Sequence, residues 1–160
     1  MYSITALAKK SALPRRTVQY WHDRQVIQPI NEEPLVYSDS ELVLVRILAA
    51  LTQSKPTVAW IKGMARILRL CIEGDASVPA DVAGAFEDAK NGKPAYFGVA
   101  PEMVSDGIGI WDWTFGAKGE SRLKAAVVER LELKPNLGLT IVDLKYCFDL
   151  TKEVGSITEC

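Results

Sequence analysis

The stretch YSITALAKKSALPRRTVQYWHDRQVIQP, residues 2–29, decides the fold of the N-terminal part of this chain. Ile4, Leu7 and Ala8 recur at the i, i+3 and i+4 spacing of an amphipathic helix. Thr5 suits the start of this helix because its hydroxyl can accept a hydrogen bond from a first-turn N–H. The pattern therefore predicts a short helix that buries one apolar stripe.

A second short helix is predicted from Pro14 to Asp23, after a connector at 11–13. Pro14 fits the first helical position, where its missing N–H costs little. Val18 and Trp21 point inward, and the opposite side carries the polar side chains: Arg15, Arg16, Gln19 and His22. A short helix with basic and amide groups at its leading end fits the DNA major groove. The segment thus favours a DNA-binding regulator over an enzyme.

Residues 2–27 resemble the opening of MerR-type winged helix-turn-helix regulators, and the run R-T-V-Q-Y-W at 16–21 is the most specific part. YSDSELVLVRILAAL (37–51) and SKPTVAWIKGMARIL (54–68) resemble the third and fourth helices of that family. The resemblance implies a winged helix-turn-helix DNA-binding domain over 1–73. It also implies transcription regulation, double-stranded DNA as partner and a homodimer.

The resemblance carries DNA-contacting roles over by position. Arg16 matches an arginine that would contact phosphate, Gln19 matches a residue near base edges, and Tyr20 matches a backbone contact. Gln can pair bidentately with adenine whereas Arg prefers guanine, so Gln19 would shift the sequence preference. The predicted DNA-contacting set is Arg15, Arg16, Thr17, Gln19, Tyr20, His22, Arg24 and Tyr37.

The predicted wing, INEEPLVYS at 30–38, departs from the family pattern. Leu35 and Val36 stand where the family has arginines, and Glu32 and Glu33 lie beside them. We therefore expect a short wing that contacts DNA weakly, which favours binding as a dimer or as an array of copies.

Charge is divided unevenly along the 160 residues, which suffice for one or two small domains. Residues 1–70 hold ten Lys and Arg against five Asp and Glu, a net charge of +5. Residues 71–160 hold nine against fifteen, a net charge of −6. A basic front and an acidic back are typical of a nucleic-acid-binding module fused to a separate domain.

The sequence predicts a cytoplasmic protein without a membrane segment. It contains no apolar run of about 20 residues and no leader-like start. Cys71, Cys147 and Cys160 are widely spaced and odd in number, which fits free thiols in a reducing compartment.

Two helices should complete the N-terminal module. The first begins at Asp39 or Ser40, runs for about 15 residues and places Arg46 on its outer side. The second is predicted over 58–71 and should end before Gly74.

Residues 74–94 are predicted to be a linker with one short helix, 80–90, stopped by Asn91-Gly92. The MerR-type regulators usually continue into a long coiled coil, but no heptad pattern follows here. The mode of dimerisation therefore stays open.

Residues 95–160 are expected to form a small α+β domain for oligomerisation or effector sensing, so that the whole chain is α+β. Strands are predicted at 95–99, 108–115 and 139–144. Segment 121–134 fits either a helix or a strand, and 145–153 either extends the last strand or forms a final helix. Trp111, Trp113 and Phe115 share one face, as an aromatic wall for a ligand or partner chain or, with greater weight, as the core of a small sheet.

The sequence predicts no active site, no metal and no cofactor. The only histidine, His22, lies on the second predicted helix, so a histidine-based triad elsewhere is excluded. No C-x-x-C pair supports a thiolate metal sensor. Gly107-Ile108-Gly109 is not followed by the predicted helix that a phosphate-binding loop requires. The carboxylates Asp106, Asp112 and Asp143 have no partners at a spacing that indicates an active site.

Two other functions remain open at this point. One is a protein-interaction module that reuses the winged-helix scaffold, with the acidic half as its working surface. The other is a DNA-architectural accessory factor in recombination or packaging. The operator sequence, the direction of regulation and any effector are not set by the sequence.

Overall fold

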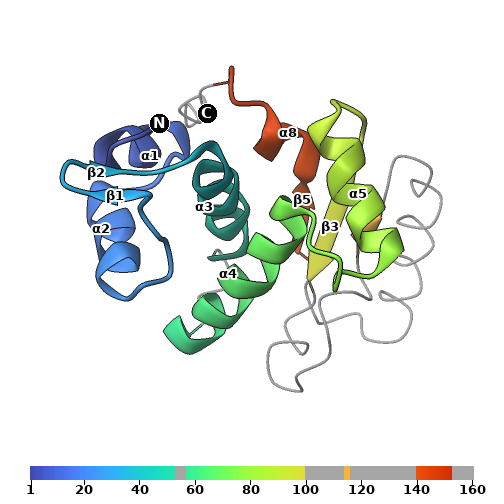
Figure 1. Ribbon diagram of the computed structural model, residues 1–160, viewed down its shortest axis with the longest axis horizontal. Coiled ribbons are helices and arrows are strands. Elements are labelled where there is room, and N and C mark those ends of the chain that lie inside the picture. The colour runs from blue at the N-terminus through green and yellow to red at the C-terminus, as the bar shows by residue number, and fades with distance from the viewer. Residues whose placement is uncertain (53–56, 100–113, 116–139, 153–160) are drawn as a thin grey trace, which may run out of the picture.

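The computed structural model describes residues 1–52, 57–99, 114–115 and 140–152, and it combines helices with two small sheets (Figure 1). The helices are α1 (Ile4–Lys10), α2 (Arg15–Asp23), α3 (Asp39–Leu51), α4 (Val58–Glu73), α5 (Ala80–Lys90) and α8 (Leu144–Phe148). The strands are β1 (Asn31–Glu32), β2 (Leu35–Val36), β3 (Tyr96–Val99), β4 (Thr114–Phe115) and β5 (Thr140–Asp143). α1, α2 and the β1–β2 hairpin lie at one end of the molecule, and α5 and the second sheet lie at the other (Figure 1).

α1 and α2 form the predicted pair of short helices around a tight turn. Ser3, not the predicted Thr5, caps α1, because its extended backbone lets its Oγ accept from the Ala6 N–H at 3.2 Å. The turn includes Ala12 in the left-handed region, at φ 51°. α2 begins one residue after Pro14. The predicted helix pair is thus confirmed, and only the cap of α1 is wrong.

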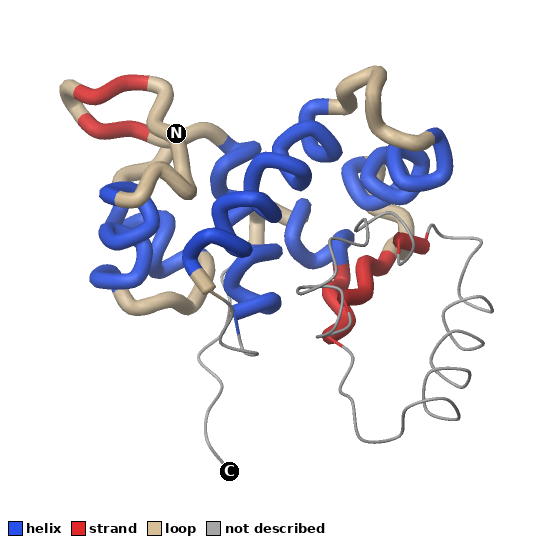
Figure 2. Tube along the Cα trace, turned by 90° about the horizontal axis from the view of Figure 1, so that it is seen from below, coloured by secondary structure: helices blue, strands red, loops and turns tan. Residues whose placement is uncertain are grey.

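The hairpin is attached to the N-terminal segment. β1 and β2 pair antiparallel, with Asn31 opposite Val36 and Glu32 opposite Leu35. The Tyr2 N–H donates to the Tyr37 carbonyl at 2.9 Å, and the Tyr37 N–H donates to the Tyr2 carbonyl at 2.8 Å. This bridge fixes the base of the hairpin, which projects from the body of the molecule (Figure 2).

α3 is the central helix. It packs against α1, α4, β5 and α8, and every residue from Glu41 to Leu48 is buried. The prediction that Arg46 lies on the outer side is therefore wrong, since only 4% of this residue is exposed. The reason is that elements from both ends of the chain cover the side of α3 that local periodicity assigned to solvent.

α4 and α5 follow the predicted bounds closely. α4 ends at Gly74, which adopts the left-handed conformation at φ 74° that favours glycine. α5 has the predicted range 80–90, and it buries Val82, Ala85, Phe86 and Ala89 against α4, β4 and α8. The segment predicted as a linker thus carries a helix that belongs to the core.

The second sheet has the strand order β4-β3-β5, with β3 antiparallel to both neighbours. Phe97 faces Val142 in the register, and both are buried. Of the two alternatives for residues after 144, the helix is correct: α8 starts at Leu144, and the Asp143 carboxylate accepts from the Tyr146 N–H at 3.1 Å. Trp111, Trp113 and segment 121–134 lie outside the described residues.

In the part of the chain that the structure describes, no helix is long and apolar enough to cross a bilayer.

Candidate nucleic-acid interface

α2 presents a basic surface opposite its buried face. Val18 and Trp21 are 0% and 2% exposed and join the core, whereas Arg15 and Arg16 are exposed. Within the described ranges, neither guanidinium has a carboxylate partner. The helix α2 therefore carries two arginines whose charges are not neutralised by a carboxylate of the described residues.

The start of α2 is unusual for a helix. Pro14 provides no side-chain cap and the first turn holds no acidic residue, so Arg15 and Arg16 lie at the positive end of the helix dipole. This placement is unfavourable for the helix alone. It suits an anion, because the first-turn N–H groups have no side-chain cap and two arginines lie in the same turn.

Further along α2, three predicted contact residues already have partners. The Gln19 Nε2 donates to the Asp23 Oδ1 at 2.9 Å, which uses one N–H of the amide and leaves its carbonyl oxygen and second N–H to meet another polar group. Tyr20 is 42% exposed, and the Arg24 guanidinium lies 5.4 Å from the centroid of its ring. Thr17 is half-buried beside them.

His22 and Tyr37 meet beneath α2. The Tyr37 hydroxyl lies 2.9 Å from the His22 Nδ1, and the rings pack edge to face. Tyr37 is fully buried; burial, followed by the negative charge of Glu41, raises its pKa to about 12. The prediction that Tyr37 contacts DNA is therefore wrong, because the bridge to Tyr2 draws it into the core. Its role is to hold the half-buried His22.

A buried ion pair supports the end of α2, and sequence reasoning missed it. The Arg69 Nε of α4 donates to the Glu41 Oε1 of α3 at 2.6 Å. Arg69 also donates to the Val26 carbonyl at 2.8 Å, and Glu41 accepts from the Gln28 N–H at 3.0 Å. These bonds fix the segment that follows α2. No local pattern identifies the pair, because its partners lie in different helices.

Acidic groups flank the basic surface. Glu32 and Glu33 are exposed on the hairpin. A hollow of about 490 Å³ lies between the end of α2, the hairpin and α4, with Glu32 and Lys62 on its wall. The hairpin thus brings negative charge close to the helix that carries the arginines.

The described residues include no cluster of three His, Cys, Asp or Glu side chains placed to hold a metal ion. Cys71 and Cys147 are buried, and burial raises the pKa of each thiol to about 12. Both therefore remain neutral thiols near neutral pH, which is unsuited to thiolate chemistry. Cys160, Asp106 and Asp112 lie outside the described residues.

Comparison with known proteins agrees with this geometry. The model of the MerR HTH family regulatory proteins matches residues 2–67, which include α1 to α3 and the first ten residues of α4. No curated protein and no solved structure matches the chain. Residues 2–67 are therefore similar in sequence to the MerR HTH family regulatory proteins.

Proposed function

We propose that this protein is a sequence-specific DNA-binding transcription regulator that places the predicted helix 14–23, observed as α2, in the major groove. The observation that carries the proposal is the pair Arg15 and Arg16, exposed and without carboxylate partners in the described ranges. Because Val18 and Trp21 anchor the opposite face, the arginines project from a rigid support. Such a support is what groove insertion requires.

The proposed contacts follow the position of each side chain on α2. Arg15, Arg16 and Tyr20 would hold the helix on phosphates, aided by the uncapped N–H groups of its first turn. Gln19 would meet a base edge with its carbonyl oxygen and its second amide N–H, while the first N–H holds the bond to Asp23. His22, Thr17 and Arg24 would add contacts at the margins.

The β1–β2 hairpin would act as the expected wing. With Glu32 and Glu33 exposed, it adds repulsion rather than attraction towards phosphate. Affinity would then come mainly from α2 of each copy, so we propose a homodimer on two half-sites. The C-terminal part would serve oligomerisation or effector sensing.

Fluorescence anisotropy of the full chain with labelled duplexes tests DNA binding. If about five phosphates are neutralised, log K should fall against log salt with a slope of roughly −4 to −5. The double variant Arg15→Ala/Arg16→Ala should bind much more weakly and with a smaller slope. Lys90→Ala is the matched control, because it removes an exposed cation from α5 at the other end of the molecule (Figure 1).

The proposal would be refuted if the chain does not bind DNA at low salt. It would also be refuted if the affinity changes neither with added salt nor with the double substitution. If the chain binds DNA, selection from a random oligonucleotide pool would give the operator sequence. Sedimentation of the selected complex would count the copies of the chain on it.

A further inference from the structure

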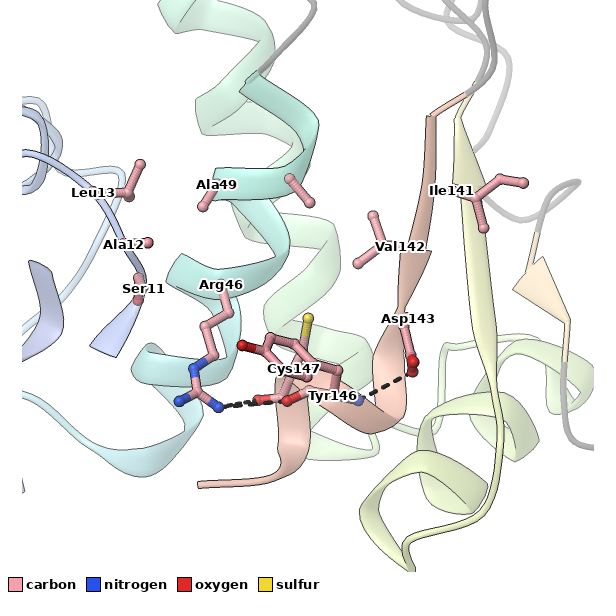
Figure 3. A pocket seen from close by; sticks show the side chains of 11 residues that line it. Ser11, Ala12, Leu13, Arg46, Ala49, Ile141, Val142, Asp143, Tyr146 and Cys147 are labelled. Atoms are coloured by element: carbon pink, nitrogen blue, oxygen red, sulfur yellow. Dashed lines mark hydrogen bonds between the residues drawn. The ribbon is translucent and has the colours of Figure 1, made fainter. Parts of the chain in front are cut away.

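A cavity of about 310 Å³ separates the helix-turn-helix turn from the second sheet (Figure 3). Its walls come from three parts of the chain: the turn at 11–13, α3, and the junction of β5 with α8. Most of the side chains that close it are apolar, among them Leu13, Ala49 and Val142. No element of the described chain fills the space between them.

Ser11 borders this cavity and holds a buried, unsatisfied hydroxyl. The residue is 5% exposed, and its Oγ has no hydrogen-bond partner among the described residues. A buried hydroxyl without a partner is costly, and it is rare enough in folded proteins to require an explanation. A ligand with one hydrogen-bonding group would supply the missing partner after a rotation of the Ser11 side chain.

The charged groups of the wall are already engaged. The Arg46 guanidinium donates to backbone carbonyls, including those of Lys10 at 3.1 Å and Asp149 at 2.8 Å. The Asp143 carboxylate accepts from the Tyr146 N–H. Burial keeps the pKa of the Cys147 thiol near 12, so this group is neutral. One cation and one anion leave the wall without net charge, which favours an uncharged ligand.

The volume indicates the size of the part of that ligand that the pocket would enclose. An engineered apolar cavity of about 150 Å³ holds one benzene molecule, and ligand pockets begin near 300 Å³. The cavity here is about twice the benzene site, which corresponds to two fused rings.

We propose that this cavity binds a small uncharged molecule of about two fused rings, whose single hydrogen-bonding group pairs with the Ser11 hydroxyl. Such a ligand touches the turn that leads into α2 and, across the cavity, β5 and α8. It therefore connects the helix-turn-helix region to the C-terminal part of the chain. The proposal does not depend on DNA binding.

2-Naphthol is a suitable probe because it has two fused rings, one hydroxyl and intrinsic fluorescence. Titration of the full chain should give saturable binding of one molecule per chain. Ser11→Ala should weaken the binding of 2-naphthol about tenfold, the equivalent of one hydrogen bond, and should leave the binding of naphthalene unchanged. Without ligand, Ser11→Ala should be at least as stable as the wild type in urea, because the lost hydroxyl has no partner.

Ala49→Leu places a larger side chain in the cavity and should abolish binding of both probes. Ala59→Leu is the matched control, since it makes the same change at an exposed position of α4. The proposal is overturned if 2-naphthol does not saturate, if Ser11→Ala binds it as the wild type does, or if Ala49→Leu binds it as Ala59→Leu does. Ser11→Ala keeps the test decisive even if Ala49→Leu fails to fold.

Discussion

Arg46 and Asp149 lie 103 positions apart in the sequence, yet the Arg46 Nη1 donates to the Asp149 carbonyl at 2.8 Å. The same guanidinium donates to the carbonyls of Lys10, Cys147 and Lys152. One side chain of α3 thus connects the end of α1 to α8 and the residues that follow it. In the described ranges, this cation is satisfied by backbone carbonyls rather than by a carboxylate.

Arg46→Met should lower the free energy of unfolding by about 3 kcal/mol, because one buried and several part-buried carbonyls lose a charged donor at once. Urea denaturation followed by circular dichroism measures this loss. Arg66→Met is the matched control, since Arg66 is exposed on α4 and should change stability by less than about 0.5 kcal/mol. Equal stability of the two variants would show that the Arg46 bonds contribute nothing.

Arg46 also marks the limit of what the sequence could predict. Local periodicity identifies one apolar face of α3, and it assigns a charged residue such as Arg46 to the opposite face, which is expected to meet solvent. In the structure, α8 and the end of α1 cover that opposite face, and both are distant from Arg46 in the sequence. The pair Glu41 and Arg69 was missed for the same reason, since the two residues lie 28 positions apart in different helices.

Local signals, by contrast, predicted the helix ends well. Gly74 ends α4 and Asn91-Gly92 ends α5, because their backbone preferences act within one turn. The inward face of α2 was predicted correctly from the spacing of Val18 and Trp21. Tyr37 was misassigned because its environment depends on the bridge to Tyr2, which no spacing reveals.

Arg16→Ala and Gln19→Ala should affect DNA binding in different ways. Arg16→Ala should weaken binding to selected and random duplexes alike and should reduce the salt slope by about 1, because it removes a phosphate contact. Gln19→Ala should cost about 1–3 kcal/mol on the selected duplex and little on random DNA. Paired anisotropy titrations on both duplexes measure the contrast. Equal losses from Gln19→Ala on the two duplexes would remove its base-reading role.

Glu32→Gln should strengthen DNA binding about threefold at low salt, because it removes a negative charge from the hairpin beside α2. The gain should shrink as salt is added, since the repulsion is screened. Glu87→Gln makes the same change on α5, at the far end from α2, and should leave binding unchanged (Figure 1). If the two variants bind alike, the hairpin does not approach DNA.

Stability should fall as the solution becomes strongly alkaline. Burial raises the pKa of Tyr37 from its ordinary value of 10 to about 12, and those of Cys71 and Cys147 from 9 to about 12. The unfolded chain therefore releases these protons first. The stabilisation is fully present below about pH 9 and is lost as the pH rises towards about 12.

The contribution of Tyr37 can be isolated by comparing two phenylalanine variants. Urea denaturation at about pH 8 and about pH 11 should show a smaller alkaline loss for Tyr37→Phe than for the wild type. Tyr20→Phe alters an exposed tyrosine, and its free energy of unfolding should decrease between the two pH values by as much as that of the wild type. The slopes against pH are compared, because Tyr37→Phe also removes the bond to His22. An unchanged slope for Tyr37→Phe would show that Tyr37 ionises equally in both states.

Trp21→Ala should cost about 3–5 kcal/mol of stability, because it empties a core position that is 2% exposed in the structure. Tyr20→Ala, on the exposed side of the same helix, should lose only about 0.5–1 kcal/mol with its contact to Arg24. Urea denaturation ranks the two variants, and Trp21→Phe should fall between them because it keeps part of the apolar volume. DNA binding should be lost in Trp21→Ala although every arginine remains, because α2 then keeps only Val18, the smaller of its two buried anchors. Wild-type affinity in a Trp21→Ala protein that still folds would mean that the arginines act without a fixed helix.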